Sequence, residues 1–173
     1  MFCKIVNDKI VNPSNFDGEK EFKLDYDEYI NNQTKYIYDV DKADIIVNPN
    51  FETEQLATAK ATKLQENINK RDARLIAGVT YKNILFDSDQ DQKINLSATA
   101  SNMSDTDTIT WYGKDGVSSL SCTKSDIENI GKLIISLTQN VWANINPMYV
   151  NKINACKTID EVNAIVIDYS VDA

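Results

Sequence analysis

The alternation of apolar and polar residues divides the chain into a strand-rich beginning and a helix-rich remainder. In the first part, short apolar runs with a period of two are separated by turn residues, which is typical of β-hairpins. The strands expected there are residues 2–6, 9–12, 21–24, 34–40 and 45–47. Pro13 should end the second strand. Asp25 is expected to cap a short helix over residues 26–32, because its carboxylate can accept hydrogen bonds from the free amides of a first turn.

A single long helix is predicted over residues 51–77, which contain no glycine or proline and are rich in Ala, Gln, Lys, Glu and Leu. Six positions repeat with 4-3-4-3-4 spacing and form one stripe: Ala57, Ala61, Leu64, Ile68, Arg71 and Leu75. The stripe is open to two interpretations, a coiled-coil seam between copies or one helix lying on its own core. Its alanines and arginine favour the second interpretation. Gly78 is expected to end this helix.

Two further hairpins and several helices are predicted after Gly78. The first hairpin pairs residues 79–81 with 84–86 around Lys82-Asn83. An acidic turn then leads into a helix over residues 91–103. The second hairpin pairs residues 108–112 with 117–122 around the turn 113–116. Thr123 or Ser125 then caps a long helix, whose pattern resumes beyond Pro147. A last short helix is expected over residues 159–165.

The sequence also predicts helix caps in the C-terminal part and the apolar face of its long helix. Ser125 and Glu128 stand at capping-box spacing, as do Thr158 and Glu161 at the last helix. One face should be core, formed by Ile127, Ile130, Leu133, Ile134, Leu137, Val141 and Trp142. Pro147 should stop or kink this helix. The tail 166–173 carries acidic residues and no clear pattern.

These elements indicate an α+β protein: a small β-rich N-terminal module, a long connecting helix, and a C-terminal domain of short hairpins packed on helices. The expected boundaries are 1–48, 49–78 and 79–173. The segment Arg71–Gln92, which combines a helix stop, a hairpin and a helix start, is interpreted as a hinge between modules.

Composition narrows the possible functions. The 173 residues carry 18 Lys+Arg and 26 Asp+Glu, and the net charge of −8 disfavours binding to nucleic acid or to anionic lipid. The chain has no histidine, which excludes Ser-His-Asp and Cys-His catalysis and histidine-ligated zinc. Cys3, Cys122 and Cys156 are too scattered for a disulfide framework, so we expect reduced thiols. The N-terminus lacks the pattern of a signal peptide, so we expect production in a cytoplasm.

Two groups of acids invite a chemical interpretation. Asp87, Asp89 and Asp91 alternate like the first ligands of a calcium loop, but Gln92 and Ala98 stand where the loop needs glycine and a bidentate acid. Helix capping is the simpler role, and a weakly held cation stays open. Asp105 and Asp107 resemble a pair of hydrolytic carboxylates only in their spacing. We therefore expect no enzymatic activity, no cofactor and no metal site.

Aromatic and apolar side chains are the candidates for partner binding. Four tyrosines crowd the first module, either as a binding surface or as half-buried strand residues. Trp111 and Tyr112 are neighbours on one strand, so they should face opposite sides of the sheet. The candidate partner-binding residues are Tyr26, Tyr29, Tyr36, Tyr38, Leu64, Ile68, Leu75, Trp111 and Tyr112.

Four segments between about Lys70 and Tyr169 carry a family resemblance. They are RDARLIAGVTYKNILFDSDQDQKINL at 71–96, DTITWYG at 107–113, SLSCTKSDIENIGKLI at 119–134 and ACKTIDEVNAI at 155–165. In order and spacing they are similar to a domain of unknown function found in tail-fibre and tail-fibre-assembly-associated proteins of tailed bacteriophages. The resemblance covers about 100 of the 173 residues, and the first segment is its most specific part.

The resemblance implies a non-enzymatic, tail-associated structural protein that is either a virion component or an accessory of the tail fibre or receptor-binding apparatus. The alternative is a transient assembly chaperone that acts in the host cytoplasm and then leaves. The implied partners are phage tail or tail-fibre proteins, and the 51–77 helix is a possible contact between copies. The implied location is the virion tail, after synthesis in the cytoplasm of the host bacterium. The family offers no catalytic residues to carry over.

Overall fold

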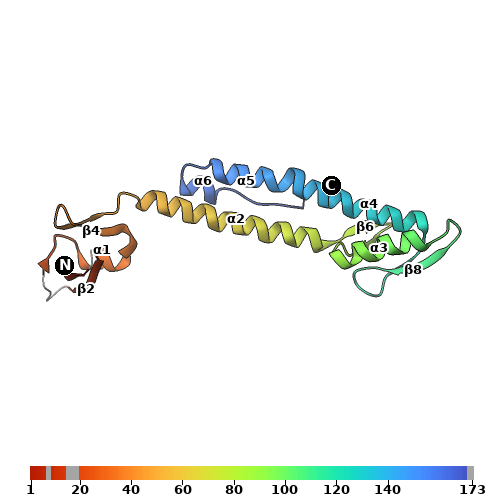
Figure 1. Cartoon of the computed structure of the whole chain (residues 1–173), viewed down its shortest axis with the longest axis horizontal. Coiled ribbons are helices and arrows are strands. Elements are labelled where there is room, and N and C mark those ends of the chain that lie inside the picture. Colours follow the sequence, from red (N-terminus) through yellow and green to blue (C-terminus); the bar gives the residue numbers. More distant parts are fainter. Residues whose placement is uncertain (7–8, 15–19, 171–173) are drawn as a thin grey trace. The chain divides into compact units, whose positions relative to one another are not determined.

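The computed structural model describes residues 1–6, 9–14 and 20–170. They form short antiparallel sheets and helices in alternation along the chain, which confirms the predicted α+β class (Figure 1). The chain is divided into two compact units, Met1–Thr58 and Ala59–Ala173. This division differs from the predicted boundaries after residues 48 and 78, because the boundary falls inside the long helix.

The described residues of unit 1 form two small antiparallel sheets. Its elements are β1 (Phe2–Val6), β2 (Lys9–Ser14), β3 (Lys20–Glu21), α1 (Tyr26–Asn31), η1 (Gln33–Lys35), β4 (Tyr36–Asp39) and β5 (Asp44–Val47). β1 lies between β2 and β3 in the first sheet, and β4 pairs with β5 in the second. The turn expected at Asn7-Asp8 lies outside the described residues.

Two strand ends in unit 1 differ from the prediction. β2 continues through Pro13 to Ser14 instead of ending before the proline. β3 ends at Glu21, well before the predicted residue 24. There the amino group of Met1 donates to the carbonyls of Phe22 and Leu24, at 3.0 and 2.9 Å, so these carbonyls are satisfied outside a strand ladder.

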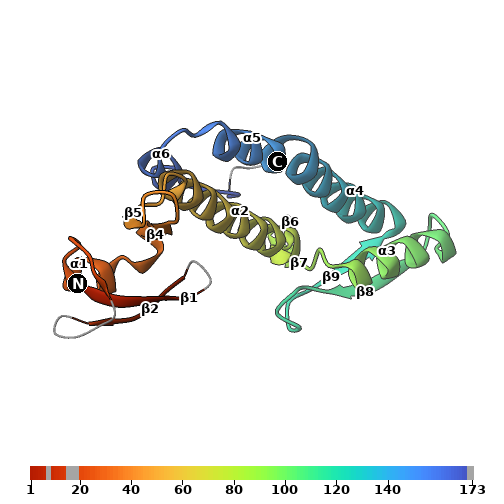
Figure 2. The same ribbon diagram turned by 60° about the vertical axis from the view of Figure 1, so that its left-hand side comes forward.

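Unit 2 is mainly helical and carries two hairpins (Figure 2). Its elements are the later part of α2 (Phe51–Ala77), then β6 (Val79–Tyr81), β7 (Ile84–Phe86), α3 (Gln90–Asn102), β8 (Thr108–Tyr112), β9 (Ser119–Thr123), α4 (Lys124–Asn140), the π-helical turn η2 (Val141–Ile145), α5 (Asn146–Ala155) and α6 (Ile159–Asn163). The bounds of α2 and of both strands of the first hairpin agree with the prediction. Among the described residues, no helix is both long and apolar enough to cross a membrane.

The Arg71–Gln92 segment lies wholly inside unit 2 and is tied together by hydrogen bonds. Gly78 ends α2 with φ +105°, and a Cβ added there would lie 2.5 Å from the carbonyl oxygen of Phe86. The buried Ser88 hydroxyl accepts from the Gly78 amide at 3.1 Å and donates to the Leu75 carbonyl at 2.6 Å. These bonds fasten the end of α2 to the turn before α3, so the segment is a hydrogen-bonded corner inside one unit and not the link between two modules that was predicted.

α4, η2 and α5 follow one another and run antiparallel to the part of α2 in unit 2 (Figure 1). Pro147 stands in the first turn of α5, directly after η2. In η2 the amide of Asn146 donates to the carbonyl of Val141, five residues back. This wider turn accommodates the proline, because its ring would clash with the carbonyl four residues earlier in a regular α-helix. Pro147 thus marks an irregular turn, as the sequence predicts.

The core of unit 2 lies between these helices and the segment after α6. Its fully buried large side chains include Phe86, Ile127, Ile130, Ile134, Val141, Ile153, Val162 and Ile167. Each buried isoleucine contributes about 1.5–3 kcal/mol by removal from water. Trp142, predicted to be core, is instead 48% exposed, with the Arg71 guanidinium of α2 4.3 Å from its ring centroid. Leu133 is 38% exposed, so the prediction that it belongs to the buried face is also wrong.

The segment after α6 is extended and contributes to the core. Ile165, Ile167 and Tyr169 are buried while the residues between them are exposed. This is a strand-like alternation, although these residues pair with no strand in the part of the chain that the structure describes. The last helix ends at Asn163 and so is shorter than predicted, because the chain becomes extended to insert these three side chains.

Candidate interaction surfaces

A groove of about 340 Å³ lies between α3 and α4. Two caps position the helices that form it. Asp89 accepts from the Gln92 amide at the start of α3, and Thr123 forms a reciprocal capping box with Asp126 at the start of α4. The residues lining the groove are Lys93, Leu96, Ser97, Ala100, Ile127, Glu128, Gly131, Lys132, Ile134 and Ile135. Its surface is mainly apolar, which suits binding better than catalysis.

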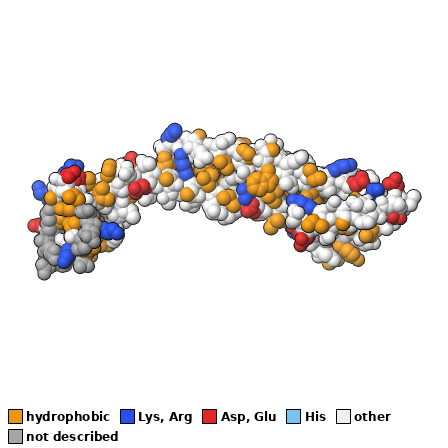
Figure 3. All heavy atoms as spheres, viewed as in Figure 1, with side chains coloured by type: hydrophobic (Ala, Val, Ile, Leu, Met, Phe, Trp, Pro, Cys, Tyr) orange, Lys and Arg blue, Asp and Glu red, His pale blue; other side chains and the backbone are white. Residues whose placement is uncertain are grey.

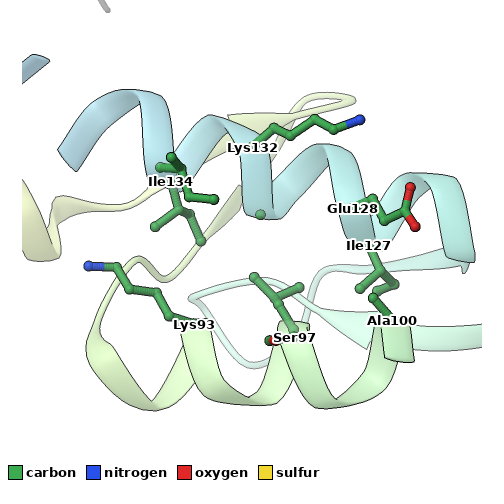
Figure 4. A pocket seen from close by; sticks show the side chains of 10 residues that line it. Lys93, Ser97, Ala100, Ile127, Glu128, Lys132 and Ile134 are labelled. Atoms are coloured by element: carbon green, nitrogen blue, oxygen red, sulfur yellow. The ribbon is translucent and has the colours of Figure 1, made fainter. Parts of the chain in front are cut away.

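Three charged side chains stand at the rim of the groove (Figure 4). Lys93 lies at one end of the groove and Glu128 at the other, while Lys132 extends from α4 on the outer side. None of the three takes part in an ion pair within the described ranges. Lys93 therefore places a positive charge at one end of the groove, and Glu128 places a negative charge toward the other end, one helical turn from Lys132 on α4. These charges are available to a partner.

Gly131 leaves the wall of the groove hollow. A Cβ built at this position meets no heavy atom within 4 Å. One helical turn further along α4, Ile135 is 57% exposed although its side chain is wholly apolar. A glycine inside a helix costs about 1 kcal/mol relative to alanine. This groove was not predicted from the hydrophobic pattern, and the glycine inside a strongly helical stretch is the signal that could have indicated it.

Asp126, in the first turn of α4, is a charged residue that is only 7% exposed. It accepts from the Tyr81 hydroxyl and the Lys82 ammonium, each at 2.7 Å, and from the amide and hydroxyl of Thr123. The Lys82 ammonium, and next the Tyr81 hydroxyl, hold the pKa of this carboxyl well below its usual range. The donor groups belong to Tyr81 and Lys82 of the first hairpin and to Thr123 at the start of α4, so this cluster fastens the hairpin to α4. The predicted box of Ser125 with Glu128 is wrong, because Thr123 and Asp126 form it.

The covered face of α2 in unit 2 is polar. Lys60, Lys63 and Lys70 donate to the main-chain carbonyls of Asn154, Ile165 and Ile167 at 2.8, 3.3 and 2.7 Å. A lysine stem can lie along apolar surface while its ammonium group finds an acceptor, which here is a main-chain carbonyl oxygen. Within unit 2, α2 therefore lies on its own core, the interpretation that the sequence favours.

The predicted stripe on α2 is displaced by about one residue from this covered face. Asn67 is 1% exposed at the centre of the face, whereas its neighbour Ile68 is 36% exposed. Leu64 and Leu75 lie half-buried at the edges of the face, and Ala61 is exposed. The displacement follows from lysine and asparagine side chains occupying positions that a hydrophobic pattern assigns to the exterior.

A buried polar cluster joins α2, α5 and the extended segment. The Asn67 amide donates to the Asn146 side-chain oxygen at 2.9 Å, and the Tyr169 hydroxyl donates to the Asn67 oxygen at 2.8 Å. Burial raises the pKa of Tyr169, so its hydroxyl stays a donor. Because these polar atoms satisfy one another inside the core, the cluster is structural.

Three of the four candidate tyrosines of unit 1 pack on other aromatic rings. Tyr29 is buried, and its ring centroid lies 6.2 Å from that of Tyr36. Tyr38 meets Phe22 edge to face at 6.1 Å. Tyr26, Tyr36 and Tyr38 are half-buried. The structure therefore brings three of the four into packing contacts and leaves each with only part of its surface for a partner.

Glu28 links the helix of unit 1 to the second sheet. Asp25 caps α1 as predicted, accepting from the Glu28 amide at 2.9 Å. The Glu28 carboxylate accepts from the Lys35 ammonium at 2.8 Å and the Tyr36 hydroxyl at 2.7 Å. These two donors, Lys35 first, lower the pKa of Glu28. The cluster has the composition of a structural tie rather than of an acid–base site.

Trp111 and Tyr112 face opposite sides of the second hairpin, as predicted. Trp111 is half-buried opposite Leu120 on the side that also carries the buried Cys122. Tyr112 is 59% exposed on the other side. Of this pair, Tyr112 is the residue that a partner can reach. Trp142 is also accessible, and the Arg71 guanidinium lies 4.3 Å from its ring centroid in a cation–π contact.

The acids that suggested chemistry have other contacts in the structure. Asp89 caps α3, and Asp87 pairs with Lys114 at 3.1 Å. Asp107 accepts from the Ser104 amide at 2.7 Å, and the highly exposed Asp105 lies 3.9 Å from the Lys124 ammonium. Within residues 1–6, 9–14 and 20–170, no group of three or more His, Cys, Asp or Glu is placed to hold a metal ion.

The three cysteines, Cys3, Cys122 and Cys156, are free and buried. On the face of the molecule in Figure 3, basic and acidic side chains are interspersed with hydrophobic ones.

Comparisons of the chain with protein-family models, with curated proteins and with solved structures found no match.

Proposed function

We propose that this protein is a non-enzymatic structural protein of a bacteriophage tail, as a virion component or as an accessory of the tail fibre or receptor-binding apparatus. The observation that carries the proposal is the resemblance of the run from about Lys70 to Tyr169 to a domain of tail-fibre-associated proteins. All four segments that carry the resemblance fall inside unit 2. A resemblance that coincides with one compact unit supports a shared domain, because domains are the units that fold and are reused.

The geometry of unit 2 supports a binding role. Its α3–α4 groove is apolar, open and rimmed by unpaired charges, which is the arrangement of a protein-binding surface. Tyr112 and Trp142 add accessible aromatic surface, the kind of side chain that dominates binding energy at interfaces. The candidate partners are phage tail or tail-fibre proteins.

Mass spectrometry of purified particles tests the proposal. The chain should be present in mature particles in a fixed ratio to a tail-fibre protein measured in the same sample. A transient assembly chaperone, the other role that the resemblance implies, predicts abundance in the infected-cell lysate and loss from mature particles. Absence from both the particles and the assembly intermediates would contradict any association with the tail.

A turnover assay on host surface glycan tests the non-enzymatic part of the proposal. The protein should release no sugar. If it does, Asp105→Asn and Asp107→Asn decide whether these acids take part, because each replacement preserves shape and removes the ionisable group. Activity that either replacement abolishes would overturn the assignment as a non-enzymatic protein.

A further inference from the structure

The α3–α4 groove contains both a hollow and a projection on the same side of one helix. The hollow is at Gly131, where an added Cβ meets nothing within 4 Å. The projection is Ile135, which is 57% exposed and lines the same groove. The two positions are one helical turn apart, about 6 Å along the axis of α4. A surface that carries a hollow and a matching projection side by side can be complementary to itself.

We propose that a second copy of this chain occupies the groove, related to the first by a two-fold axis that passes between Gly131 and Ile135. In this arrangement the two α4 helices run antiparallel, and Ile135 of each copy enters the hollow at Gly131 of the other. The contact is made twice, as two-fold symmetry requires. It covers the apolar surface that each copy alone leaves open to water.

The charges at the rim determine the direction of the contact. Lys93 and Glu128 stand at opposite ends of the groove (Figure 4). An antiparallel copy brings Lys93 of each chain to Glu128 of the other, which gives two ion pairs per dimer. A parallel copy would bring lysine to lysine and glutamate to glutamate. Opposite charges across an interface set its register, so these residues favour the antiparallel arrangement.

The net charge of −8 does not prevent this association. At about 0.15 M salt the Debye length is about 8 Å, so charges remote from the groove are screened from the other copy. Locally the rim carries two lysines and one glutamate. This inference does not rest on the phage role, because it follows from the shape and charge of the groove alone. It assigns the groove to a second copy, and the exposed Tyr112 and Trp142 are then the surface left for other partners.

Sedimentation equilibrium of the full chain up to about 0.2 mM tests the proposal, with circular dichroism to verify folding. The protein should be a dimer, and Ile135→Glu should weaken dimerisation at least about tenfold, because it places two carboxylates in apolar hollows. The matched control is Ile76→Glu, since Ile76 is also 57% exposed and lies on α2 outside the groove. This control should dimerise like the original protein.

A charge exchange tests the orientation. Lys93→Glu should weaken the dimer, and Lys93→Glu combined with Glu128→Lys should restore it to within about threefold. A monomer at all concentrations would overturn the proposal. A dimer that survives Ile135→Glu, or that Ile76→Glu disrupts, would place the contact elsewhere. A double exchange that fails to restore the dimer would refute the antiparallel pairing.

Discussion

Replacement of Asp126 by asparagine is the most direct test of how unit 2 is held together. The carboxylate accepts four hydrogen bonds, from the side chains of Tyr81 and Lys82 on one oxygen and from Thr123 on the other. Asparagine has the same shape but only one accepting oxygen, so its amide group must face two donors. A hydrogen bond to a charged acceptor contributes about 1.5–3 kcal/mol net.

Two hydrogen bonds are lost, and water recovers part of the loss at the exposed Lys82. We therefore expect a decrease of about 2–3 kcal/mol in the free energy of unfolding. For a chain of this length that corresponds to a fall in Tm of roughly 5–10 °C. Both tryptophans, Trp111 and Trp142, lie in unit 2. Urea unfolding followed by tryptophan fluorescence therefore reports on the affected unit.

The pH dependence provides a second measurement on the same variant. The pKa of Asp126 is lowered in the folded protein, chiefly by Lys82. Its contribution is therefore complete above the pKa of the unfolded chain, about 4, and is lost as the pH falls below that value. The stability difference between the original protein and Asp126→Asn should be constant from pH 7 to about 5 and should narrow toward pH 3.

Asp105→Asn is the matched control for this prediction. It makes the same chemical change at a side chain that is 96% exposed, and the urea midpoint should not move. Equal midpoints for Asp126→Asn and Asp105→Asn would refute the assignment of Asp126 as the tie between the hairpin and α4. A stability difference that persists undiminished at pH 3 would refute the electrostatic origin of the effect.

Three further expectations concern the backbone, the buried polar cluster and the thiols. Gly78→Ala should destabilise unit 2 by at least about 2 kcal/mol in urea, because it adds a clash to an unfavourable φ. Gly116→Ala, at φ +69° with open space around it, should cost only the strain of about 1 kcal/mol. Tyr169→Phe should lower the free energy of unfolding by about 1–2 kcal/mol, because Asn67 loses a buried donor. All three cysteines should resist a thiol reagent until urea unfolds the chain.

Each of these expectations has an outcome that would contradict it. Equal effects of Gly78→Ala and Gly116→Ala would show that the approach of Gly78 to Phe86 is not tight. An unchanged midpoint for Tyr169→Phe would mean that water replaces the hydroxyl, so the site would not be closed. Rapid modification of a cysteine in the native protein, at the rate seen in urea, would contradict its burial.

Features that depend on neighbouring residues were predictable from the sequence. The bounds of α2 follow from a run of good helix formers that Gly78 ends. The first hairpin follows from its turn, in which Lys82 and Asn83 adopt φ of 47° and 62°. The capping box at Thr158 and Glu161 was also correct. In each case the determining contacts lie within a few residues of one another.

Features that depend on distant residues were mispredicted or missed. Two capping boxes were possible at the start of α4, and Asp126 forms the real one because Tyr81 and Lys82 reach it from the first hairpin. The predicted stripe on α2 was displaced from the covered face, because a hydrophobic pattern gives no weight to Asn67 or to lysines that bond to main-chain carbonyls. The α3–α4 groove depends on the spacing of two helices, and Gly131 is the one residue whose presence in the sequence could have indicated it.

The polar covered face of α2 has a consequence for the order in which the protein takes shape during synthesis. Its lysines bond to carbonyls that lie 94, 102 and 97 residues further along the chain. At about 5–20 residues per second, α2 waits roughly 5–20 s on the ribosome before these partners have been made. A helix with a strongly apolar face would spend that time exposing an adhesive surface. Lysine and asparagine remain hydrated during the interval, so this face is less adhesive than an apolar face of the same size would be until unit 2 closes.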